Sequence, residues 1–466
     1  RRREPSGSTR CPGMDETRYT EALSVTRYDA MSNRIGMTAQ STAILGGGAL
    51  GLTLAWRLAQ AGERVVVFER EREAGGLAAG FRVDETGPWL EKFYHHLFAT
   101  DTDAVALIGE LGLGAKLTWR TPNSSMLIGG KPYRLDSDPR SILSLSPLPL
   151  FDRLRLGAGG AILKFLPTPQ PLASSTAADW LSRWMGPRAY ETVWKPMLEG
   201  KFGERADDIA MPWMWARAHY RTLRLGYLLG GFQQIYESLA AGIQTRGGEV
   251  RLGVEVRAIS PEGKGLRIIS SQGDERFDRV VSTLPTRVTC RLAPDLPAAY
   301  RARYEWGEAF GAHCLILALD RPLLPEHIYW LAIGDEGYPF LNAIEHTNFI
   351  EPEEYGGKRL VYFGNYTPMD HPVLREAPDQ ALERYLPGIL RLNPAFERDW
   401  ITRMWGFAAP WAQPIVTRDY ASHIPPHETP IPNLYVANMF QVYPQDRGQN
   451  YSIRMANRLA QRLLAR

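Results

Sequence analysis

The sequence is poor in cysteine and contains no long apolar run. Its 466 residues include three cysteines, Cys11, Cys290 and Cys314, which lie far apart and show no CxxC spacing. An odd number of widely spaced cysteines indicates neither a disulfide framework nor a zinc site, and it fits a reducing, cytoplasmic compartment. No run of 18 apolar residues occurs, so we expect no membrane-spanning helix.

An excess of charge of one sign is also missing. The chain has 54 basic and 51 acidic residues, which gives a formal net charge of +3. This balance predicts that nucleic acid is not a partner. The 44% of hydrophobic residues is close to the globular average, which excludes a fully disordered or fibrous chain. The length allows two or three structural units with a substantial core.

Residues 1–40 lack a sustained apolar period. Three arginines open the chain, but no apolar stretch follows them, and Asp15 and Glu16 argue against a transit peptide. Met37 directly precedes the first convincing element and would be a sensible natural start. We therefore interpret residues 1–40 as a disordered extension or as foreign sequence.

The strongest motif lies in residues 41–69. An apolar strand (43–45) leads into a glycine-rich turn (46–51), a helix that Gly62 ends, and a second apolar strand (65–68). Gly46, Gly48 and Gly51 satisfy GxGxxG: the first permits the turn, the second lets the backbone approach a pyrophosphate, and the third lets the helix pack on the strand. Ala49 and Leu50 lie between them, where the amides that open the helix would face the anion. The pattern predicts a dinucleotide site.

Glu69 closes the second strand, 18 residues after Gly51. A carboxylate at this point can accept hydrogen bonds from an adenosine ribose, and it would repel a 2′-phosphate. NADP is therefore disfavoured, which leaves FAD or NAD. A glycine-rich turn with a purely structural role is the alternative, but the strand, the helix stop and the terminal acid all favour nucleotide binding.

The segment after Glu69 separates these two cofactors. It resembles the double-glycine element that follows the Rossmann unit in flavoproteins of the flavin amine oxidase and protoporphyrinogen oxidase superfamily. The resemblance implies FAD, bound with the help of Arg70, Gly75, Gly76 and Leu77. Two consecutive glycines would let the main chain pass beside the extended pyrophosphate and ribityl chain.

A second segment extends the resemblance. A helix begins at Gly230 and ends at Gly247, and residues 249–257 then alternate between apolar and charged side chains. Alternation predicts one half-buried strand, with Leu252 on its buried face. In the family this block returns the chain to the FAD domain, and the strand backbone meets the adenine, which here would fall near Val256.

The third segment closes the chain. A strand at 434–437 is followed by residues 445–450 and by an amphipathic helix, an order similar to the closing flavin motif of the family. The resemblance implies that main-chain groups of Gly448, Gln449 and Asn450 bind the flavin ring and stabilise negative charge there. Asn438 stands where the family usually has an acid or a glycine that contacts the ribityl chain.

The resemblance implies an α/β fold, in which a Rossmann-like FAD-binding domain of the GR2 flavoprotein type carries an inserted α+β substrate domain. The FAD-binding domain would be discontinuous, made of residues 41–120, 226–288 and 425–466. The substrate domain would consist of residues 121–225 and 289–424. Three stretches far apart along the chain would therefore meet around one cofactor.

Three histidines are candidate catalytic residues. Amine oxidases of the superfamily carry a lysine near flavin N5, whereas the corresponding stretch here, 311–322, has no lysine and His313 falls closest to that position. Ordinary amine oxidation is therefore in doubt, and a satisfied strand histidine is the alternative for His313. His95 and His96 lie in a segment similar to the histidine-bearing segment of UDP-galactopyranose mutases. The alternative for that segment is a partly buried aromatic stripe, and it lacks a third ligand for a metal site.

The leading hypothesis is an FAD-dependent oxidoreductase similar to protoporphyrinogen oxidases and phytoene desaturases. It would transfer hydride from a bulky, largely apolar substrate to flavin N5, and dioxygen or another acceptor would reoxidise the flavin. One alternative is a redox-neutral sugar-nucleotide mutase that uses reduced FAD. Another is a non-enzymatic binding protein on the same scaffold. No motif predicts the oligomeric state.

Two further segments suggest partners. Lys195, Lys201, Arg217 and Arg221 lie close in sequence and could hold an acidic or pyrophosphate-bearing substrate, although a solvated helix face is the commoner explanation. Residues 142–166 are leucine-rich with interspersed basic residues, and one interpretation of this composition is a peripheral membrane contact. A buried lid is the alternative that we favour there, because the prolines at 147 and 149 interrupt any single amphipathic helix.

Overall fold

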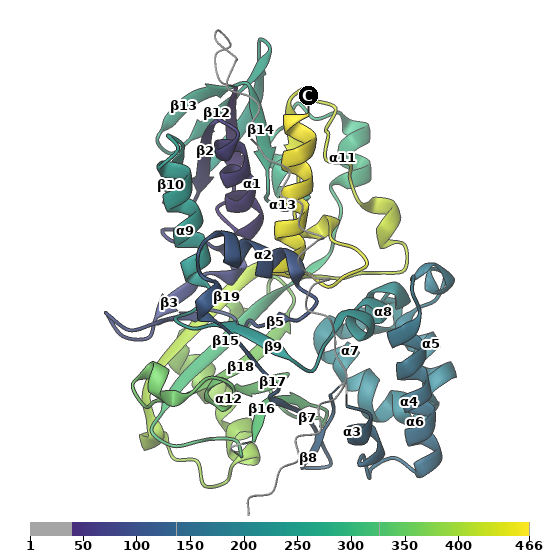
Figure 1. The fold of residues 1–466 in the computed structure, drawn as a ribbon. Coiled ribbons are helices and arrows are strands. Elements are labelled where there is room, and N and C mark those ends of the chain that lie inside the picture. Colours follow the sequence, from purple (N-terminus) through teal and green to yellow (C-terminus); the bar gives the residue numbers. More distant parts are fainter. Residues whose placement is uncertain (1–39, 137, 326, 466) are drawn as a thin grey trace, which may run out of the picture. The chain divides into compact units, whose positions relative to one another are not determined.

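The computed structural model describes residues 40–136, 138–325 and 327–465. The expected extension at 1–40 thus lies, apart from Gln40, outside the described residues. Figure 1 shows the described chain coloured along the sequence.

A parallel sheet of five strands has the order β10–β2–β1–β14–β20. It carries the motif that predicts a dinucleotide site, and we call this half of the molecule the nucleotide-binding half. These strands are β1 (Ser41–Leu45), β2 (Arg64–Glu69), β10 (Glu249–Leu252), β14 (Arg279–Ser282) and β20 (Leu434–Val436). They come from three stretches that are far apart in the sequence. Because all five strands are parallel, their carboxyl ends meet at one edge of the sheet, where doubly wound proteins bind their ligands.

Both faces of this sheet are covered, which explains the apolar, buried runs of its inner strands, such as 65–68 of β2. On one face α1 (Ala49–Gln60) packs between α9 (Gln233–Gln244) and α13 (Gln449–Leu464) (Figure 1). On the other face lies an antiparallel meander of β11 (Val256–Glu262), β12 (Gly265–Ser270) and β13 (Gly273–Phe277). Successive side chains alternate accordingly, since Val67 contacts the helices and Phe68 the meander.

The single strand predicted for residues 249–257 is wrong, because the chain divides into β10 and β11. Gly253 between them has a φ of 71°, and the amide of Val254 donates to the carbonyl of Glu69 at 2.8 Å. Leu252, predicted to be buried, is 39% exposed, whereas Val254 is 1% exposed. The alternation is broken because β10 pairs with β2 alone and the chain then leaves for the meander.

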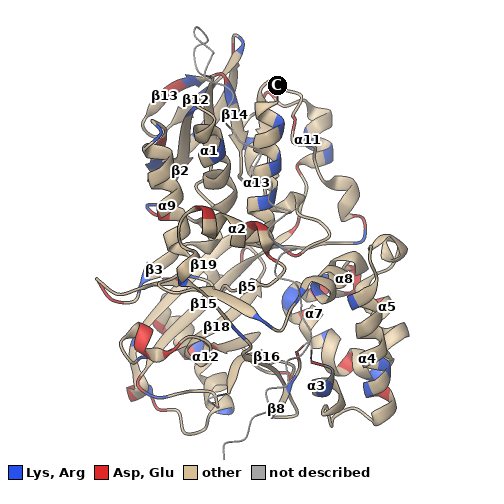
Figure 2. Cartoon of the chain, viewed as in Figure 1, with Lys and Arg blue, Asp and Glu red and all other residues tan. Residues whose placement is uncertain are grey.

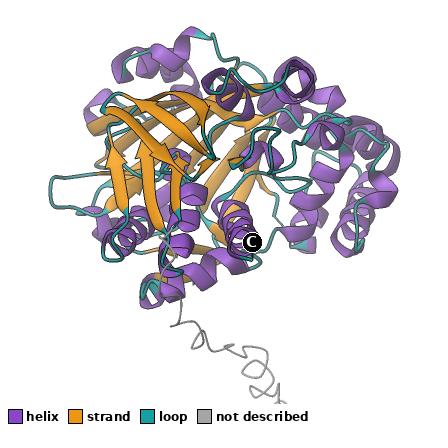
Figure 3. Ribbon diagram, turned by 90° about the horizontal axis from the view of Figure 1, so that it is seen from above, coloured by secondary structure: helices purple, strands orange, loops and turns teal. Residues whose placement is uncertain are grey.

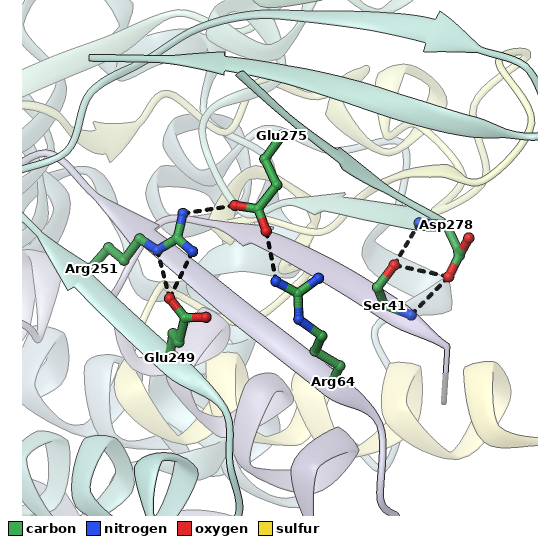
Figure 4. A network of polar contacts seen from close by, with 6 residues as sticks. All are labelled: Ser41, Arg64, Glu249, Arg251, Glu275 and Asp278. Atoms are coloured by element: carbon green, nitrogen blue, oxygen red, sulfur yellow. Dashed lines mark hydrogen bonds and ion pairs between the residues drawn. The ribbon is translucent and has the colours of Figure 1, made fainter. Parts of the chain in front are cut away.

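Polar contacts at the strand ends tie the meander to the sheet. Figure 4 shows the residues involved, which are Ser41, Arg64, Glu249, Arg251, Glu275 and Asp278. The carboxylate of Glu275 accepts from Arg64 at 2.7 Å and from Arg251 at 2.8 Å. These side chains are partly exposed, so each pair contributes at most about 1 kcal/mol and the network mainly fixes register.

The second half contains a mixed sheet of seven strands in the order β19–β15–β18–β17–β16–β7–β8. They are β7 (Asn123–Ile128), β8 (Lys131–Arg134), β15 (Ala309–Leu319), β16 (Ile328–Ile333), β17 (Asn342–Glu345), β18 (Arg359–Thr367) and β19 (Ile401–Pro414). One face packs on α12 (Pro378–Leu392), and the other joins the core shared with α1 and α9. Both predicted pieces of the substrate domain therefore contribute to one sheet.

Helices α3 to α8 form a group beside this sheet, at the right in Figures 1 and 3. They are α3 (Pro139–Leu143), α4 (Leu150–Phe165), α5 (Ala177–Met185), α6 (Pro187–Ala189), α7 (Lys195–Phe202) and α8 (Met211–Tyr220). The prolines at 147 and 149 lie between α3 and α4, as their helix-breaking character predicts. Among the described residues, no helix combines the length and apolar character needed to cross a bilayer.

The remaining helices and strands are short. They are β3 (Gly80–Arg82), β4 (Trp89–Glu91), β5 (Leu97–Phe98), α2 (Thr102–Glu110), β6 (Leu117–Arg120), β9 (Leu225–Leu228), α10 (Thr286–Leu292) and α11 (Ala298–Tyr304). The strands β5, β9 and β6 pair in a small antiparallel sheet.

Candidate functional site

The glycine turn after β1 leaves no room for side chains at two positions. At Gly46, where φ is 108°, a Cβ atom would lie 2.4 Å from the hydroxyl oxygen of Thr283. At Gly51 it would lie 2.0 Å from the carbonyl oxygen of Gly46. Glycine is therefore required at both positions, by the turn and by the close packing of α1 on β1, as the motif predicts.

Gly48 differs, because the space beside it is open. Its φ of −80° suits any residue, and the nearest atom to an added Cβ is the Cα of Gly76 at 3.9 Å. Gly48 caps α1 without a side-chain hydrogen bond, so the amides that follow at Ala49 and Leu50 open the helix uncapped. An anion placed here would meet free amides and the positive end of the helix dipole.

The double glycine lies directly against this turn. The amide of Gly75 donates to the carbonyl of Gly47 at 2.8 Å, and Gly75 forms a parallel bridge with Gly48. Gly75 and Gly76 both have positive φ, 119° and 59°, which glycine adopts without strain. Leu77 follows them, half-buried. The two glycine segments thus bound one space.

Glu69 lies beside the same turn. One of its carboxylate oxygens accepts from the amide of Gly47 at 2.7 Å and the other from the amide of Glu71 at 2.9 Å. Arg70 is exposed and pairs with Glu71. Val256, half-buried at the start of β11, is close in sequence to Val254, which bonds the Glu69 carbonyl. The segment expected near the adenine therefore lies next to the acid expected near the ribose.

The C-terminal motif reaches the same edge of the sheet through β20. Gly448 caps α13 without a side-chain bond. Gln449 accepts from the Tyr236 hydroxyl at 2.5 Å, and Asn450 accepts from the Ala104 amide at 3.0 Å. The buried Nδ2 of Asn450 has no hydrogen-bond partner in the described part of the chain. A buried donor of this kind fits a bound polar group.

Asn438, which follows β20, is buried and engaged by the protein. Its Nδ2 donates to the Leu284 carbonyl at 2.9 Å and to the Thr286 hydroxyl at 3.1 Å, and its Oδ1 accepts from the Phe440 amide. Its expected contact with a ribityl chain stays a prediction.

His95 is a neutral, half-buried histidine. Its Nδ1 lies 2.5 Å from the carbonyl oxygen of Phe93. A carbonyl only accepts, so Nδ1 carries the proton and Nε2 is left as an acceptor. Burial lowers the pKa of His95 to about 4, against the effect of the Phe93 carbonyl, and Arg447 lowers it further. The residue can thus accept a hydrogen bond at neutral pH but does not supply a positive charge.

His96 lies within an aromatic cluster. Its ring stands edge-on to those of Phe98, Tyr329 and Trp330, and its Nδ1 lies 3.2 Å from the Tyr329 hydroxyl. Burial and the nearby Arg221 lower its pKa to about 3. Within the described ranges, no group of three or more His, Cys, Asp or Glu side chains could hold a metal ion.

His313 is placed on the wrong face for a role near the flavin. Side chains on β15 alternate: Cys314 belongs to the core shared with α1, whereas Leu315 packs with α12. His313 shares the face of Leu315, and its Nδ1 lies 3.0 Å from the hydroxyl of Tyr385 on α12. We therefore correct the hypothesis and assign His313 to the packing of α12, because alternation along the strand turns it away from the nucleotide-binding half.

Sequence reasoning missed the role of Arg447 and Tyr366 in this region. Arg447 directly precedes Gly448, and its guanidinium donates to the Tyr366 hydroxyl at 2.8 Å. Tyr366 comes from β18, 81 residues away, and no local pattern links the two. They join the C-terminal motif to the seven-stranded sheet.

Glu91 is a fully buried carboxyl group between the two halves. It accepts from the Phe232 amide at 2.7 Å and from the Tyr227 hydroxyl at 2.9 Å. The network continues through Tyr355 to His346. Burial raises the pKa of Glu91 from 4.5 to about 7, although both hydrogen bonds lower it. The carboxyl is thus costly to ionise in the folded protein.

Glu91→Gln should change the pH dependence of stability. Between pH 4.5 and about 7 the Glu91 carboxyl keeps its proton in the folded state and loses it in the unfolded state. The free energy of unfolding of the wild type therefore falls as pH rises through this range. The stability difference, variant minus wild type, should grow by about 3 kcal/mol across this window and stay level above it. Denaturation midpoints between pH 4.5 and 8 measure it, with Glu85→Gln, an exposed carboxylate, as the control. A difference that is constant with pH would contradict this assignment.

These features define a class of protein. A parallel sheet carries a glycine turn, an acid on the second strand, a double glycine and a C-terminal helix without a side-chain cap, which is the arrangement expected of a dinucleotide site. Known proteins show which family has this arrangement. Residues 51–444 match the family of flavin-containing amine oxidoreductases, and the chain belongs to that family. It is a flavin-dependent oxidoreductase by class.

Curated relatives of the chain include desaturases. The chain is 24% identical to the 15-cis-phytoene desaturase of Synechococcus elongatus over 285 residues, which cover 54% of this chain and 59% of that protein. It is 34% identical to the 15-cis-phytoene desaturase of Arabidopsis thaliana over 89 residues, 19% of this chain and 16% of that protein. The chain therefore matches less than two thirds of the length of these relatives.

Solved structures share the fold. A protein from Exiguobacterium described as a protoporphyrinogen oxidase matches with a TM-score of 0.74 at 17% identity, covering 92% of this chain and all of that one. Reduced UDP-galactopyranose mutase matches with a TM-score of 0.72 at 16% identity, covering 92% of this chain and 96% of that one. Putrescine oxidase bound to putrescine matches with a TM-score of 0.66 at 16% identity and covers 92% of this chain and all of that one. These likenesses establish a flavin amine oxidase-type fold.

Proposed function

We propose that the chain binds FAD and oxidises a bulky, largely apolar substrate by hydride transfer to the flavin. The observation that carries this proposal is the meeting of three distant segments. The glycine turns at Gly48 and Gly75 bridge each other, Tyr236 of α9 lies against Gly75, and Gln449 at the start of α13 accepts from the Tyr236 hydroxyl. Helices α1 and α13 both begin without a side-chain cap. Two free helix N-termini suit a long cofactor that has a diphosphate at one end and a polar ring at the other.

Bound FAD would supply hydride acceptance at flavin N5, with dioxygen or another acceptor removing the electrons. The chain's own residues would position the reactants. The amides at the start of α13 favour negative charge nearby, and His95 offers a neutral acceptor at Nε2. The described face of β15 that turns towards the nucleotide-binding half carries Ala312 and Cys314 instead of a lysine, which supports a substrate other than a simple amine.

A second candidate is a redox-neutral mutase that acts on a sugar nucleotide. Two observations favour it: the neutral His95 and His96, and a group of basic side chains near Arg447 that a diphosphate would suit. Such an enzyme would need its flavin reduced beforehand and would consume no net electrons.

Anaerobic mixing tests the proposal. Oxidised holoprotein is mixed separately with an amine, a porphyrinogen, a polyprenoid and a UDP-sugar, and the flavin absorbance is followed. We expect bleaching by the porphyrinogen or the polyprenoid. Failure of all four to bleach the flavin, with conversion of the UDP-sugar only by reduced protein, would favour the mutase instead.

We also propose that α4 contacts the surface of an anionic membrane. Contrary to the buried lid that we favoured for 142–166, this helix exposes large apolar side chains: Phe165 is 81% exposed and Phe151 is 72% exposed. Leu150, Leu154 and Ile162 lie on the same side at helical spacing, opposite the buried Leu156 and Leu163. An exposed apolar helix face of this kind suits an interfacial position.

Charge supports an anionic bilayer as the surface. Arg153, Arg155 and Lys164 flank the apolar face, and their described hydrogen bonds go to main-chain carbonyls, so no described carboxylate neutralises them through these bonds. Basic residues beside an interfacial helix attract anionic lipid headgroups.

Substituting Phe151→Asp and Phe165→Asp together should weaken binding to vesicles of phosphatidylglycerol at least about tenfold, because each change removes an inserted ring and adds a repelled charge. Sedimentation with vesicles measures the binding. Leu390→Asp, at an exposed apolar position on α12, is the matched control and should bind as wild type does. Equal binding of the double variant would contradict the proposed contact.

A further inference from the structure

A cluster of four basic side chains surrounds a single carboxylate beside the C-terminal motif. They are Lys201 on α7, Arg217 on α8, Arg221 at the end of α8, and Arg447, and the carboxylate is that of Asp446. Figure 2 shows basic residues on α7 and α8 in blue. The sequence suggested that Lys201, Arg217 and Arg221 could act together, and the fold adds the pair at 446 and 447 from 225 or more positions away.

Asp446 holds the centre of this cluster. Its Oδ2 lies 2.9 Å from Nζ of Lys201 and 2.6 Å from the guanidinium of Arg217. Arg447 lies 4.0 Å from the other oxygen. The Trp213 ring contacts two of the cations, with Nζ of Lys201 at 5.3 Å and the Arg217 guanidinium at 4.9 Å from its centroid. These contacts position the cations rigidly before any ligand arrives.

The cluster carries more positive than negative charge. Burial, Arg217 and Arg447 hold the pKa of Lys201 well below its usual range, although Asp446 raises it. Even with Lys201 neutral, three guanidinium groups face one carboxylate, a surplus of two positive charges. Arg221 makes no ion pair within the described ranges, and repulsion from Arg217 together with burial lowers its pKa to about 9. Repulsion between arginines of this kind is relieved by a bound anion.

The site is enclosed but solvent can reach it. The side chains of Lys201 and Arg217 are 12% and 16% exposed. Arg221, at the end of α8, is exposed. Charge interactions around Lys201 and Arg217 are less screened than on an open surface.

The cluster adjoins the expected flavin site. Arg447 directly precedes Gly448, which caps α13, and its charge reaches His95. The Arg221 guanidinium lies 5.9 Å from the centroid of the Phe98 ring, and His96 packs edge-on against the same ring. An anion held by these cations would therefore lie next to the residues that the proposed function places around the reacting part of the substrate.

We propose that Lys201, Arg217, Arg221 and Arg447 bind a compact oxyanion of about two negative charges that forms part of the substrate. Phosphate esters and paired carboxylates share this chemistry, and both match the planar donors of arginine. The proposal rests on the proposed function for its place beside the flavin. It deepens that function, since the substrate would join an anionic group to the part that is oxidised.

Anion titration of the holoprotein tests this inference. Inorganic pyrophosphate, inorganic phosphate and succinate are titrated separately by calorimetry at low ionic strength. We expect saturable binding of at least one of them, which weakens as salt is raised. Tighter binding of pyrophosphate or phosphate identifies a phosphate-bearing substrate, and tighter binding of succinate a carboxylate-bearing one. Absence of saturable binding by all three would overturn the inference.

Variants show whether this cluster is the binding site. Arg221→Gln should weaken binding of the preferred anion at least about tenfold, because a charged hydrogen-bond donor is lost. The Arg221→Gln variant should remain folded, since Arg221 forms no ion pair with another described residue. Arg224→Gln, at an exposed arginine that stacks on Trp119 outside the cluster, is the matched control and should bind the anion as wild type does.

Two results separate this inference from the proposed function. Flavin content is measured on the same samples. If Arg221→Gln retains FAD and binds the anion as tightly as wild type does, the proposed anion site is contradicted and the proposed function is not. Protein that binds the anion but takes up no FAD contradicts the proposed function and leaves the anion site standing.

Discussion

Replacing Gly48 with glutamate is expected to leave the protein folded but unable to retain FAD. The protein itself has room for a side chain here, because Gly48 has an ordinary φ and an added Cβ meets no atom closer than 3.9 Å. That open space lies over the amides that begin α1, where the diphosphate would be held. A carboxylate in it would fill the space and repel the diphosphate, at a cost of several kcal/mol. FAD affinity should fall at least about a hundredfold.

The control for this variant is Gly62→Ala. Gly62 follows the other end of α1, and an added Cβ there meets nothing within 4 Å. Its φ of 86° strains alanine by about 1 kcal/mol, so stability should drop slightly while FAD content stays at the wild-type level. Circular dichroism and flavin content of both purified variants give the comparison. Equal FAD occupancy in the two variants would show that the diphosphate is held elsewhere.

Asp446→Asn is expected to cause the largest loss of stability among the changes considered. Although burial alone would raise the pKa of Asp446, Lys201, Arg217 and Arg447 hold it well below its usual range. Removing this one carboxylate leaves several enclosed cations without a counter-charge. Breaking a buried ion pair from one side costs about 3–5 kcal/mol, so the denaturation midpoint should fall markedly.

Asp103→Asn is the matched control for Asp446→Asn. Asp103 pairs with Arg454 at 2.7 Å, and both side chains are more exposed than those around Asp446, so its loss should cost about 1 kcal/mol or less. Because the folded-state pKa of Asp446 is lowered, its stabilising effect is present above about pH 4 and fades as pH falls further. Similar midpoints for both variants at pH 7 would contradict a central role for Asp446.

The nucleotide half could be predicted from sequence because its signals are local. The spacing of Gly46, Gly48 and Gly51, the acid at Glu69, and the double glycine each follow from backbone geometry within a few residues. The end of β10 before Gly253 was not predicted, because the alternation of apolar and charged residues continues past Gly253. Only the pairing of β10 with β2 and of β11 with β12 shows where one strand ends.

The second half was harder, because its important contacts join residues that are distant in sequence. The position of His313 along the chain suggested a place near the flavin. Its side chain instead lies on the face of β15 that packs on α12, and the sequence does not show which face that is. In the sequence, Lys201 and Arg217 are typical of a solvated helix face. Their role depends on their ion pairs with Asp446, which lies more than 200 residues away in the sequence. The exposed apolar face of α4 could not be predicted from composition either, since a leucine-rich segment is compatible with a buried helix and with an exposed apolar one.

The most direct test of the account is the flavin content of the purified protein. Acid release followed by chromatography identifies the bound flavin and gives its amount per chain. We predict FAD at close to one molecule per chain, or its uptake to that level when the protein is incubated with FAD. Colourless protein that takes up no FAD, while remaining folded, would contradict the claim that the three distant segments enclose this cofactor.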